Sequence, residues 1–182
     1  MPTDTLIRDA RPADMDAVAA VYSREVLEGT ATFEEKPPSP AAMAERLAAV
    51  RRYGLPWLVA EVDGRVAAYG YAAPFRARAA YRYAVESSIY VDPTFQGRGL
   101  GGALMDRIIV HCRAMGLRQM IAAVSNSESR ASFLLHEKLG FRPVGVYERV
   151  GWKMGRWLDV ILLQLDLDPG GGAPDALGLD LE

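Results

Sequence analysis

The sequence predicts a single α/β domain in which helices flank one mixed central sheet. Short apolar runs typical of strands alternate with segments whose apolar residues recur at helical spacing, in the order strand, two helices, three strands, helix, strand, helix, two strands. The chain has 182 residues, 50% of them hydrophobic and 24% charged, which is enough to bury one core of ordinary globular composition. No repeat or linker indicates a second domain, and we expect the domain to span residues 1–167.

The first elements are a strand and two helices. Residues 5–10 have the composition of a short strand. Asp14 is expected to cap a helix whose apolar face holds Met15, Val18, Ala19, Tyr22 and Val26. After a polar, proline-containing loop, Ser39 is expected to cap a second helix, with Pro40 at its first position and Gly54 as its stop.

The middle of the chain is expected to form a hairpin and a third neighbouring strand. Residues 57–62 and 65–71 flank Asp63-Gly64, a pair that suits the tight turn between antiparallel strands. A basic, aromatic connection then leads to an apolar strand at residues 84–91, which Glu86 interrupts.

The last elements alternate between helices and strands. A helix beginning in a glycine cluster runs to about Met115, and a second helix ends before Gly140. The remaining strands are expected at residues 119–124, 141–150 and 156–167. Residues 168–182 have the composition of a flexible C-terminal tail.

Composition excludes several classes of function. The net charge of −2 offers no broad basic field for nucleic acid, and no run of about eighteen apolar residues indicates a membrane span. The chain has one cysteine, Cys112, in step with the apolar face of its helix, so we expect a buried core thiol. No His/Cys spacing predicts a metal site. Because the first residues also lack a signal-peptide pattern, we expect a cytoplasmic protein.

The strongest motif places four glycines within six positions, Gly97 to Gly102, between an apolar strand and a helix. A simple connecting turn is one explanation. A dinucleotide site is a second, since the spacing satisfies G-x-G-x-x-G, but five residues separate the strand from the first glycine and the next strand ends without an acid. The third is a diphosphate on the free N–H groups of the helix N-terminus, with Arg98 nearby.

Coenzyme A has the two parts that this third explanation requires. Its pyrophosphate suits the glycine loop, and its amide-bearing arm can pair like an added strand with the strand that ends in Ile89, Tyr90 and Val91. We therefore expect this site to bind coenzyme A.

The same stretch resembles a known family. Residues 91–101, VDPTFQGRGLG, are similar to the acyl-CoA signature of the GNAT superfamily of N-acetyltransferases at Gln96, Gly99 and Gly101. The segments RARAAYRYAVESSIYV, LHEKLGF and GWKMGRWLDV resemble the phosphinothricin acetyltransferase group, including its methionine sulfoximine-acetylating members. The resemblance implies the GNAT fold and acetyl-CoA as a co-substrate. It implies a cofactor site at Ile89, Tyr90, Val91, Gln96, Gly97, Arg98, Gly99, Leu100, Gly101, Gly102, Ser129 and Ser132. Ser129 stands where the family usually has asparagine, so we expect a weakened or water-mediated contact there.

Two side chains are candidates for proton transfer. Glu86 lies in an apolar strand, where desolvation would raise its pKa, although a strand glutamate can also simply face solvent. The resemblance places the family's catalytic glutamate here. His136 stands where many relatives carry a tyrosine acid, and it could protonate the leaving thiolate, contact the substrate, or be a core histidine bonded to a carbonyl.

The acceptor is expected to be a small amino acid with a tetrahedral side-chain group, acetylated on its α-amino group by direct attack in a ternary complex. Arg76, Arg78 and Tyr81 precede Glu86, and guanidinium groups pair with carboxylates and phosphinates. The family pattern favours Arg78 and Tyr81 as contacts and Phe33 as a lid aromatic. The alternatives are another small amine, a peptide N-terminus, or a non-catalytic acyl-CoA-binding module.

A homodimer is the last expectation. Trp152 and Trp157 flank the final turn, and exposed aromatics are common at the centres of interfaces. By resemblance, that turn would approach the partner's acceptor pocket, where Lys153 would contact an anionic substrate. The alternative is that both tryptophans close the core and Lys153 is solvated.

Overall fold

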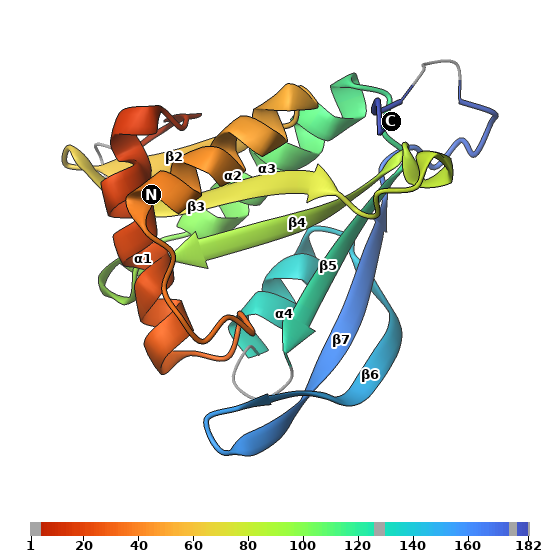
Figure 1. Cartoon of the computed structure of the whole chain (residues 1–182). Helices are drawn as coiled ribbons and strands as arrows, with labels where there is room; N and C mark the ends of the chain where they lie inside the picture. Colours follow the sequence, from red (N-terminus) through yellow and green to blue (C-terminus); the bar gives the residue numbers. More distant parts are fainter. Residues whose placement is uncertain (1–4, 126–129, 175–177, 182) are drawn as a thin grey trace.

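The computed structural model describes residues 5–125, 130–174 and 178–181 and shows one seven-stranded sheet with helices on its two faces (Figure 1). The strands are β1 (Thr5–Asp9), β2 (Trp57–Val62), β3 (Arg65–Pro74), β4 (Ala84–Val91), β5 (Gln119–Ser125), β6 (Arg142–Lys153) and β7 (Arg156–Asp166). The α-helices in this part of the chain are α1 (Met15–Glu28), α2 (Pro40–Arg52), α3 (Leu100–Ala114) and α4 (Arg130–Lys138). Their order confirms the predicted fold class.

The sheet is mixed, with the strand order β1-β2-β3-β4-β5-β7-β6. Every neighbouring pair is antiparallel except β4 and β5, which are parallel and connected through α3. This parallel pair is short, because β4 and β5 are paired only from Ala84 opposite Gln119 to Glu86 opposite Ile121. Beyond Glu86 the two strands diverge, and we call this point the fork.

The two tight turns of the sheet explain its hairpins. Asp63 and Gly64 both have positive φ, of 50° and 75°, which is the backbone of the predicted β2–β3 turn. Met154 and Gly155 repeat this geometry between β6 and β7, with φ of 52° and 72°. Because that turn is only two residues long, β6 extends to Lys153, three residues beyond its predicted end.

The two predicted helix caps differ in outcome. Ser39 caps α2 as predicted, since its side chain accepts a hydrogen bond from the Ala42 N–H at 3.2 Å. Asp14 precedes α1 but does not cap it with its side chain. Its carboxylate instead accepts two hydrogen bonds from the Arg8 guanidinium, at 2.7 and 2.8 Å, and one from the Arg11 N–H. The Arg8 guanidinium offers the carboxylate two parallel hydrogen bonds and an opposite charge, whereas a cap offers N–H groups alone, which explains the correction.

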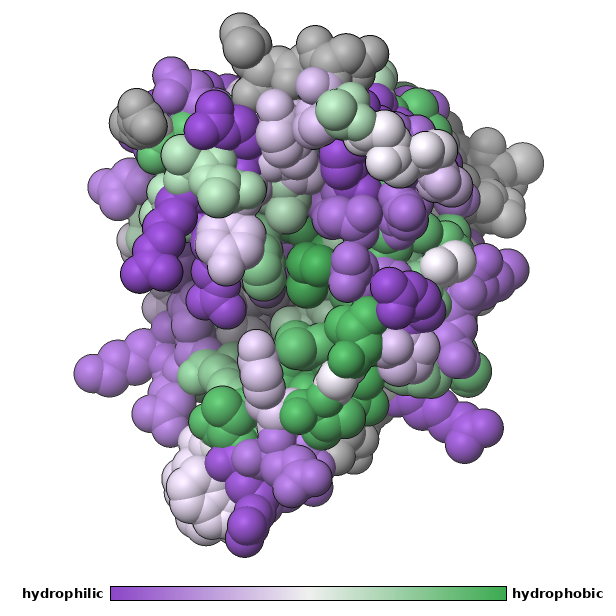
Figure 2. All heavy atoms as spheres, turned by 90° about the vertical axis from the view of Figure 1, so that its right-hand side faces the viewer, coloured by the Kyte–Doolittle hydropathy of each residue, from purple (hydrophilic) through white to green (hydrophobic). Residues whose placement is uncertain are grey.

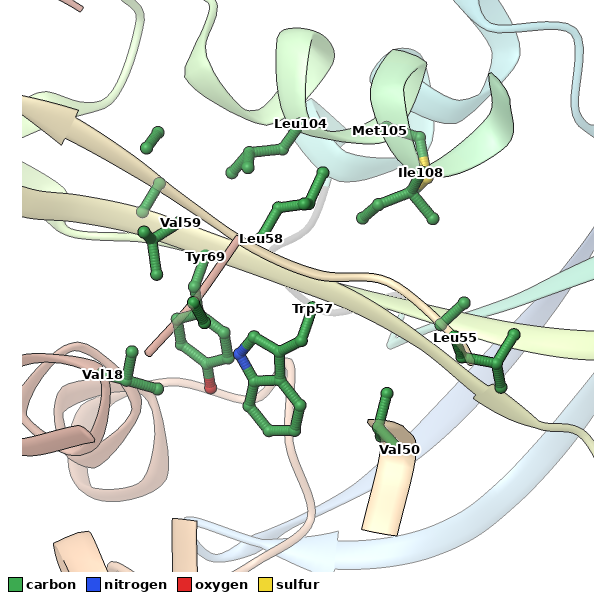
Figure 3. Close-up of a cluster of buried hydrophobic side chains, with 14 of the residues drawn as sticks. Val18, Val50, Leu55, Trp57, Leu58, Val59, Tyr69, Leu104, Met105 and Ile108 are labelled. Carbon is green, nitrogen blue, oxygen red and sulfur yellow. The ribbon is translucent and has the colours of Figure 1, made fainter. Parts of the chain in front are cut away.

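The core lies on both faces of β2 and β3 (Figure 3). Trp57 and Tyr69 point towards α1 and α2, where Val18 and Val50 meet them, whereas Leu58 points to the opposite face. That second face is covered by the residues Leu104, Met105 and Ile108 of α3. The alternation follows the two-residue period of a strand, so a central strand buried on both faces is apolar throughout.

Two smaller expectations concern the core. Cys112 is fully buried on α3, as predicted, and burial raises the pKa of its thiol to about 12, so it is a packing residue and not a nucleophile. Part of the segment expected as a flexible tail is packed: Leu179 is buried, and its N–H donates to the Arg82 carbonyl oxygen at 2.9 Å. No helix among the described residues is both long and apolar enough to cross a membrane.

Candidate active site

A cavity of about 1020 Å³ lies at the fork. Its walls come from the end of α1 and the segment that follows it, from β4 and β5, and from the first turns of α3 and α4. These elements are far apart in the sequence, and the divergence of β4 from β5 is what leaves room between them. This volume is at the upper end of the range for small-molecule and cofactor sites.

The glycine loop, residues 96–102, forms one end of the cavity. Gly97 and Gly99 have φ of 74° and 80°, in the left-handed region that side chains other than glycine rarely adopt. Gly99 is the residue before α3, so the N–H groups of the first helical turn follow it directly. Such a helix start is a binding site for phosphate.

The edge of β4 forms the second part of the cofactor site. Past the fork, the ladder of β4 pairs only with β3 in the described part of the chain, so residues 87–91 expose main-chain groups on the cavity side. Ile89, Tyr90 and Val91 line the cavity there. An extended amide-bearing ligand can pair with this edge as an added strand would.

These two features fit coenzyme A. The residues predicted for it that line the cavity are Ile89, Tyr90, Val91, Gln96, Gly97, Gly99, Leu100, Gly101, Gly102 and Ser132. Arg98 is exposed outside the lining, with its guanidinium 5.0 Å from the centre of the Phe95 ring. Ser129 lies outside the described residues. A side chain at Gly101 would lie 3.4 Å from Leu135, so the loop and α4 approach each other closely where the ligand must pass.

Glu86 stands at the fork itself. It is the last β4 residue paired with β5, and its half-buried side chain lines the cavity. Burial raises the pKa of this carboxyl group, and the positive charge of Arg76 offsets part of the effect. A carboxylate with a raised pKa is a better proton acceptor than a solvated one.

His136 faces the same cavity from α4. His136 is only 5% exposed, and its Nδ1 atom lies 2.7 Å from the Ser132 carbonyl oxygen. A carbonyl oxygen only accepts, so Nδ1 carries the proton and the neutral ring has none on Nε2. Burial lowers the pKa of His136. As a neutral ring it can accept a proton or hydrogen bond at Nε2, but it has no proton there for a leaving thiolate.

The residues predicted for the acceptor separate into two groups. Phe33 lines the cavity and is 41% exposed. Arg76, Arg78 and Tyr81 lie on the connection before β4, outside the cavity lining. The Phe75 ring joins two of them, with the Arg76 guanidinium 4.9 Å from its centre and the Tyr81 ring 5.6 Å away.

Lys153 is placed differently from either expectation. It is neither solvated nor part of the cavity lining, because its ammonium group is buried against two main-chain carbonyl groups of its own chain. An ammonium held in this way is not directed into the cavity of its own chain. The predicted substrate contact across a dimer interface involves a partner chain and stays a prediction.

Sequence reasoning missed several residues that line the cavity. From α1 and the following segment these are Arg24, Glu25, Glu28, Gly29, Thr30, Ala31 and Thr32, and from β5 Ala122, Ala123, Val124 and Ser125. Arg24 is half exposed beside the glycine loop, 3.3 Å from Asp92. No local motif marks these positions. The only sequence signal was the polar loop before Ser39, which was not expected to form a wall.

The chain is similar to several known proteins over most of its length. Residues 19–141 match the model of the acetyltransferase (GNAT) family. The chain is 43% identical over 164 residues to a phosphinothricin N-acetyltransferase of Alcaligenes faecalis, covering 90% of this chain and 83% of that protein. It is 40% identical over 169 residues to an L-methionine sulfoximine/L-methionine sulfone acetyltransferase of Pseudomonas paraeruginosa, covering 92% and 98%. A crystal structure of a phosphinothricin acetyltransferase from Sinorhizobium meliloti in complex with AcCoA has a TM-score of 0.90 and 42% identity, covering 93% of this chain and 92% of that one.

The mixed sheet, whose one parallel pair among the described strands opens beside a glycine-rich helix start, and the family match together place the chain in the acyltransferase class of enzymes. Within that class, the chain belongs to the GNAT family of acetyltransferases, whose acetyl donor is acetyl-CoA. The family resemblance drawn from residues 91–101 is thereby confirmed.

Proposed function

We propose that this protein transfers the acetyl group of acetyl-CoA to the α-amino group of a small amino acid, by direct attack in a ternary complex. Phosphinothricin, methionine sulfoximine and methionine sulfone represent the acceptor class. The observation that carries the proposal is the place of Glu86, at the fork and in one cavity with the glycine loop. The names of two relatives, at 43% and 40% identity, support the acceptor class.

The reaction requires one proton to leave the amine and one proton to reach the departing thiolate. Bound acetyl-CoA supplies a thioester, whose C–S bond breaks as the amine nitrogen forms the new C–N bond. An amino group is largely protonated at neutral pH, so its proton must leave before or during attack. Glu86 accepts that proton, directly or through water. The electron pair of the broken bond leaves with sulfur, and the thiolate takes a proton from water, since neutral His136 has none on Nε2.

The acceptor end of the cavity suits a small ligand. Residues 29–33, with Phe33 at their end, line the same cavity as Glu86 and form part of its wall. Arg76 lies near enough to Glu86 to affect the pKa of its carboxyl group, and it can attract an anionic acceptor to the entrance. A compact amino acid fits beside the wall formed by residues 29–33, and its carboxylate group would be attracted by Arg76.

A thiol-release assay tests the proposal. We expect the highest kcat/KM for phosphinothricin, methionine sulfoximine or methionine sulfone, in a panel that includes a polyamine and a peptide with a free N-terminus. A higher value for the polyamine or the peptide would favour those acceptors instead. Thermal stabilisation by acetyl-CoA without thiol release from any amine would contradict the enzymatic proposal and indicate a binding module.

The proposal includes a homodimer in the cytoplasm. β6 is an edge strand whose hairpin with β7 carries exposed apolar residues, and we call these the hairpin patch: Val144, Val146, Tyr147, Val150, Trp152, Met154 and Trp157. Figure 2 shows hydrophobic side chains gathered on the lower half of the side where β6 lies in Figure 1. A contiguous apolar patch and an unpaired strand edge are together typical of an interface. The single thiol Cys112 is compatible with a reducing compartment.

A further inference from the structure

Lys153 connects β6 to the wall of the cavity. Its Nζ donates hydrogen bonds to the carbonyl oxygen of Thr32 at 2.8 Å and to that of Glu25 at 3.3 Å. Glu25 is in the last turn of α1, and Thr32 is in the 29–33 segment that lines the cavity. One buried ammonium group therefore joins the end of a helix, the cavity wall and a strand more than a hundred residues later.

The chemistry of this contact is specific to a cation. The carbonyl groups of the last helical turn carry the helix's negative partial charge, so an ammonium group suits the Glu25 carbonyl oxygen, which also accepts from the Gly29 N–H at 3.0 Å. Removing a charged group from water is costly unless it is paired, and only 5% of Lys153 is exposed. A neutral side chain of the same length would leave the Thr32 carbonyl without this donor.

Gly151 supplies the second contact between β6 and the wall. A side chain at Gly151 would overlap the ring of Phe33, so this ring lies directly on the bare main chain of β6. Gly151 is two residues before Lys153 and therefore on the same face of the strand. The two residues together hold the 29–33 segment at its carbonyl group and at its aromatic ring.

Other contacts hold the segment from different directions. The Tyr22 hydroxyl group of α1 lies 2.7 Å from the Thr32 hydroxyl group. Ser125, at the end of β5, donates to the Thr30 hydroxyl group at 3.3 Å. These contacts join the segment to α1 and to β5, whereas Lys153 and Gly151 join it to the β6–β7 hairpin.

We propose that Lys153 is a positioning residue that holds the 29–33 segment, and Phe33 with it, as a wall of the acceptor end of the cavity. It acts through the segment and does not contact the acceptor. The inference rests on the proposed function for its catalytic consequence, since Phe33 matters only if an acceptor binds beside it. The glycine loop lies at the start of α3, a different element from those that Lys153 joins.

The test compares Lys153→Met with Lys153→Arg and with Lys138→Met, a control at an exposed lysine on α4. Misplacement of a positioning element by about 1 Å can reduce catalysis about a hundredfold, so we expect the KM for the acceptor in Lys153→Met to rise on the order of tenfold or more. The KM for acetyl-CoA should stay within about twofold, and Lys153→Arg should recover part of the loss. An acceptor KM equal to that of Lys138→Met would overturn the proposal.

Two further measurements keep the inference separate from protein stability and from the proposed function. Gly151→Ala should displace Phe33 without touching the charge and should raise the acceptor KM, whereas Gly145→Ala, on the same strand with open space around it, should not. In hydrogen exchange, residues 29–33 should exchange faster in Lys153→Met than in the wild type, whereas α3 should exchange at the same rate in both proteins. If residues 29–33 also exchange at the same rate in both proteins, the inference is overturned, even if no acceptor proves active in the wild type.

Discussion

The Nδ1–H group of His136 donates a hydrogen bond of 2.7 Å to the main-chain carbonyl oxygen of Ser132, one turn earlier on α4. Sequence reasoning left open whether this histidine is an acid, a substrate contact or a bonded core residue. The structure gives it features of a core residue and of a cavity residue. The ring is buried and bonded like a core histidine, and it also lines the cavity. Its bare Nε2 is available as an acceptor.

The first prediction concerns pH and the stability that depends on His136. Burial lowers the pKa of His136 in the folded state, whereas an unfolded histidine has a pKa of about 6.5. Between these values the unfolded state binds more protons, so the free energy of unfolding falls as the pH drops from about 7 through 6.5 towards the folded pKa. We expect His136→Gln to lose this part of the pH dependence. Urea unfolding from pH 7.5 to 5.5 measures it.

The control for this prediction is the same substitution at the chain's other histidine, His111, which is exposed on α3. His111→Gln should retain the wild-type dependence on pH. Identical slopes for the wild type and His136→Gln would show that the Ser132 bond tolerates protonation of the ring.

The second prediction concerns Glu86 in catalysis. Glu86→Gln cannot accept the proton of the amine, so kcat should fall on the order of a hundredfold or more at neutral pH, with little change in acetyl-CoA affinity. The deficit should shrink as the pH rises, because more of the acceptor amine is then deprotonated in solution. Steady-state kinetics between pH 6.5 and 9.5 check this, with the exposed Glu45→Gln as the matched control. A constant deficit across that range would argue against a base.

The third prediction concerns Glu86 in stability and has the opposite sign from its effect on activity. Burial raises the pKa of this carboxyl group, so the folded state binds more protons between about 4.5 and the raised value. The contribution of Glu86 to the free energy of unfolding is therefore highest below that window and decreases as the pH rises through it. Glu86→Gln should be more stable than the wild type at pH 7.5, and the difference should vanish towards pH 4. A difference that does not depend on pH would mean that packing, not charge, is responsible.

The fourth prediction concerns the glycine loop. At Gly101 a valine side chain would begin 3.4 Å from Leu135 and 3.6 Å from Ile89, inside the passage that the ligand must use. Gly101 has helical backbone, so the change should not strain the fold as it would at Gly99, where φ is 80°. We expect the acetyl-CoA Kd of Gly101→Val to rise on the order of tenfold or more, by calorimetry. Ala103→Val, two residues later on α3, controls for a β-branched residue in the helix and should bind normally.

A feature could be predicted from the sequence when the residues that determine it are close together in the chain. Helical periodicity, the Asp63-Gly64 turn and the glycine cluster are local, and the elements that they predicted are all present. Glu86 was found through its place in an apolar strand and through the family resemblance, both of which are visible in residues next to it in the sequence. The contact between Lys153 and Thr32 spans 121 residues and has no local pattern. Arg8 and Asp14 are only six residues apart, but no sequence pattern marks their ion pair, which replaced the expected cap.

The last prediction concerns the dimer proposed from the hairpin patch. The rings of Trp152 and Trp157 lie 5.2 Å apart in an edge-to-face arrangement and are 55% and 58% exposed, so they do not close the core of their own chain. Large aromatic residues at the centre of an apolar surface carry much of the binding energy of an interface. We expect Trp157→Glu to convert a dimer into a monomer in sedimentation at micromolar concentration, because an unpaired charge at an interface centre is strongly unfavourable. Val110→Glu, at an exposed apolar position on α3, should remain a dimer. A wild type that sediments as a monomer would exclude the dimer, and the hairpin patch would then need another partner.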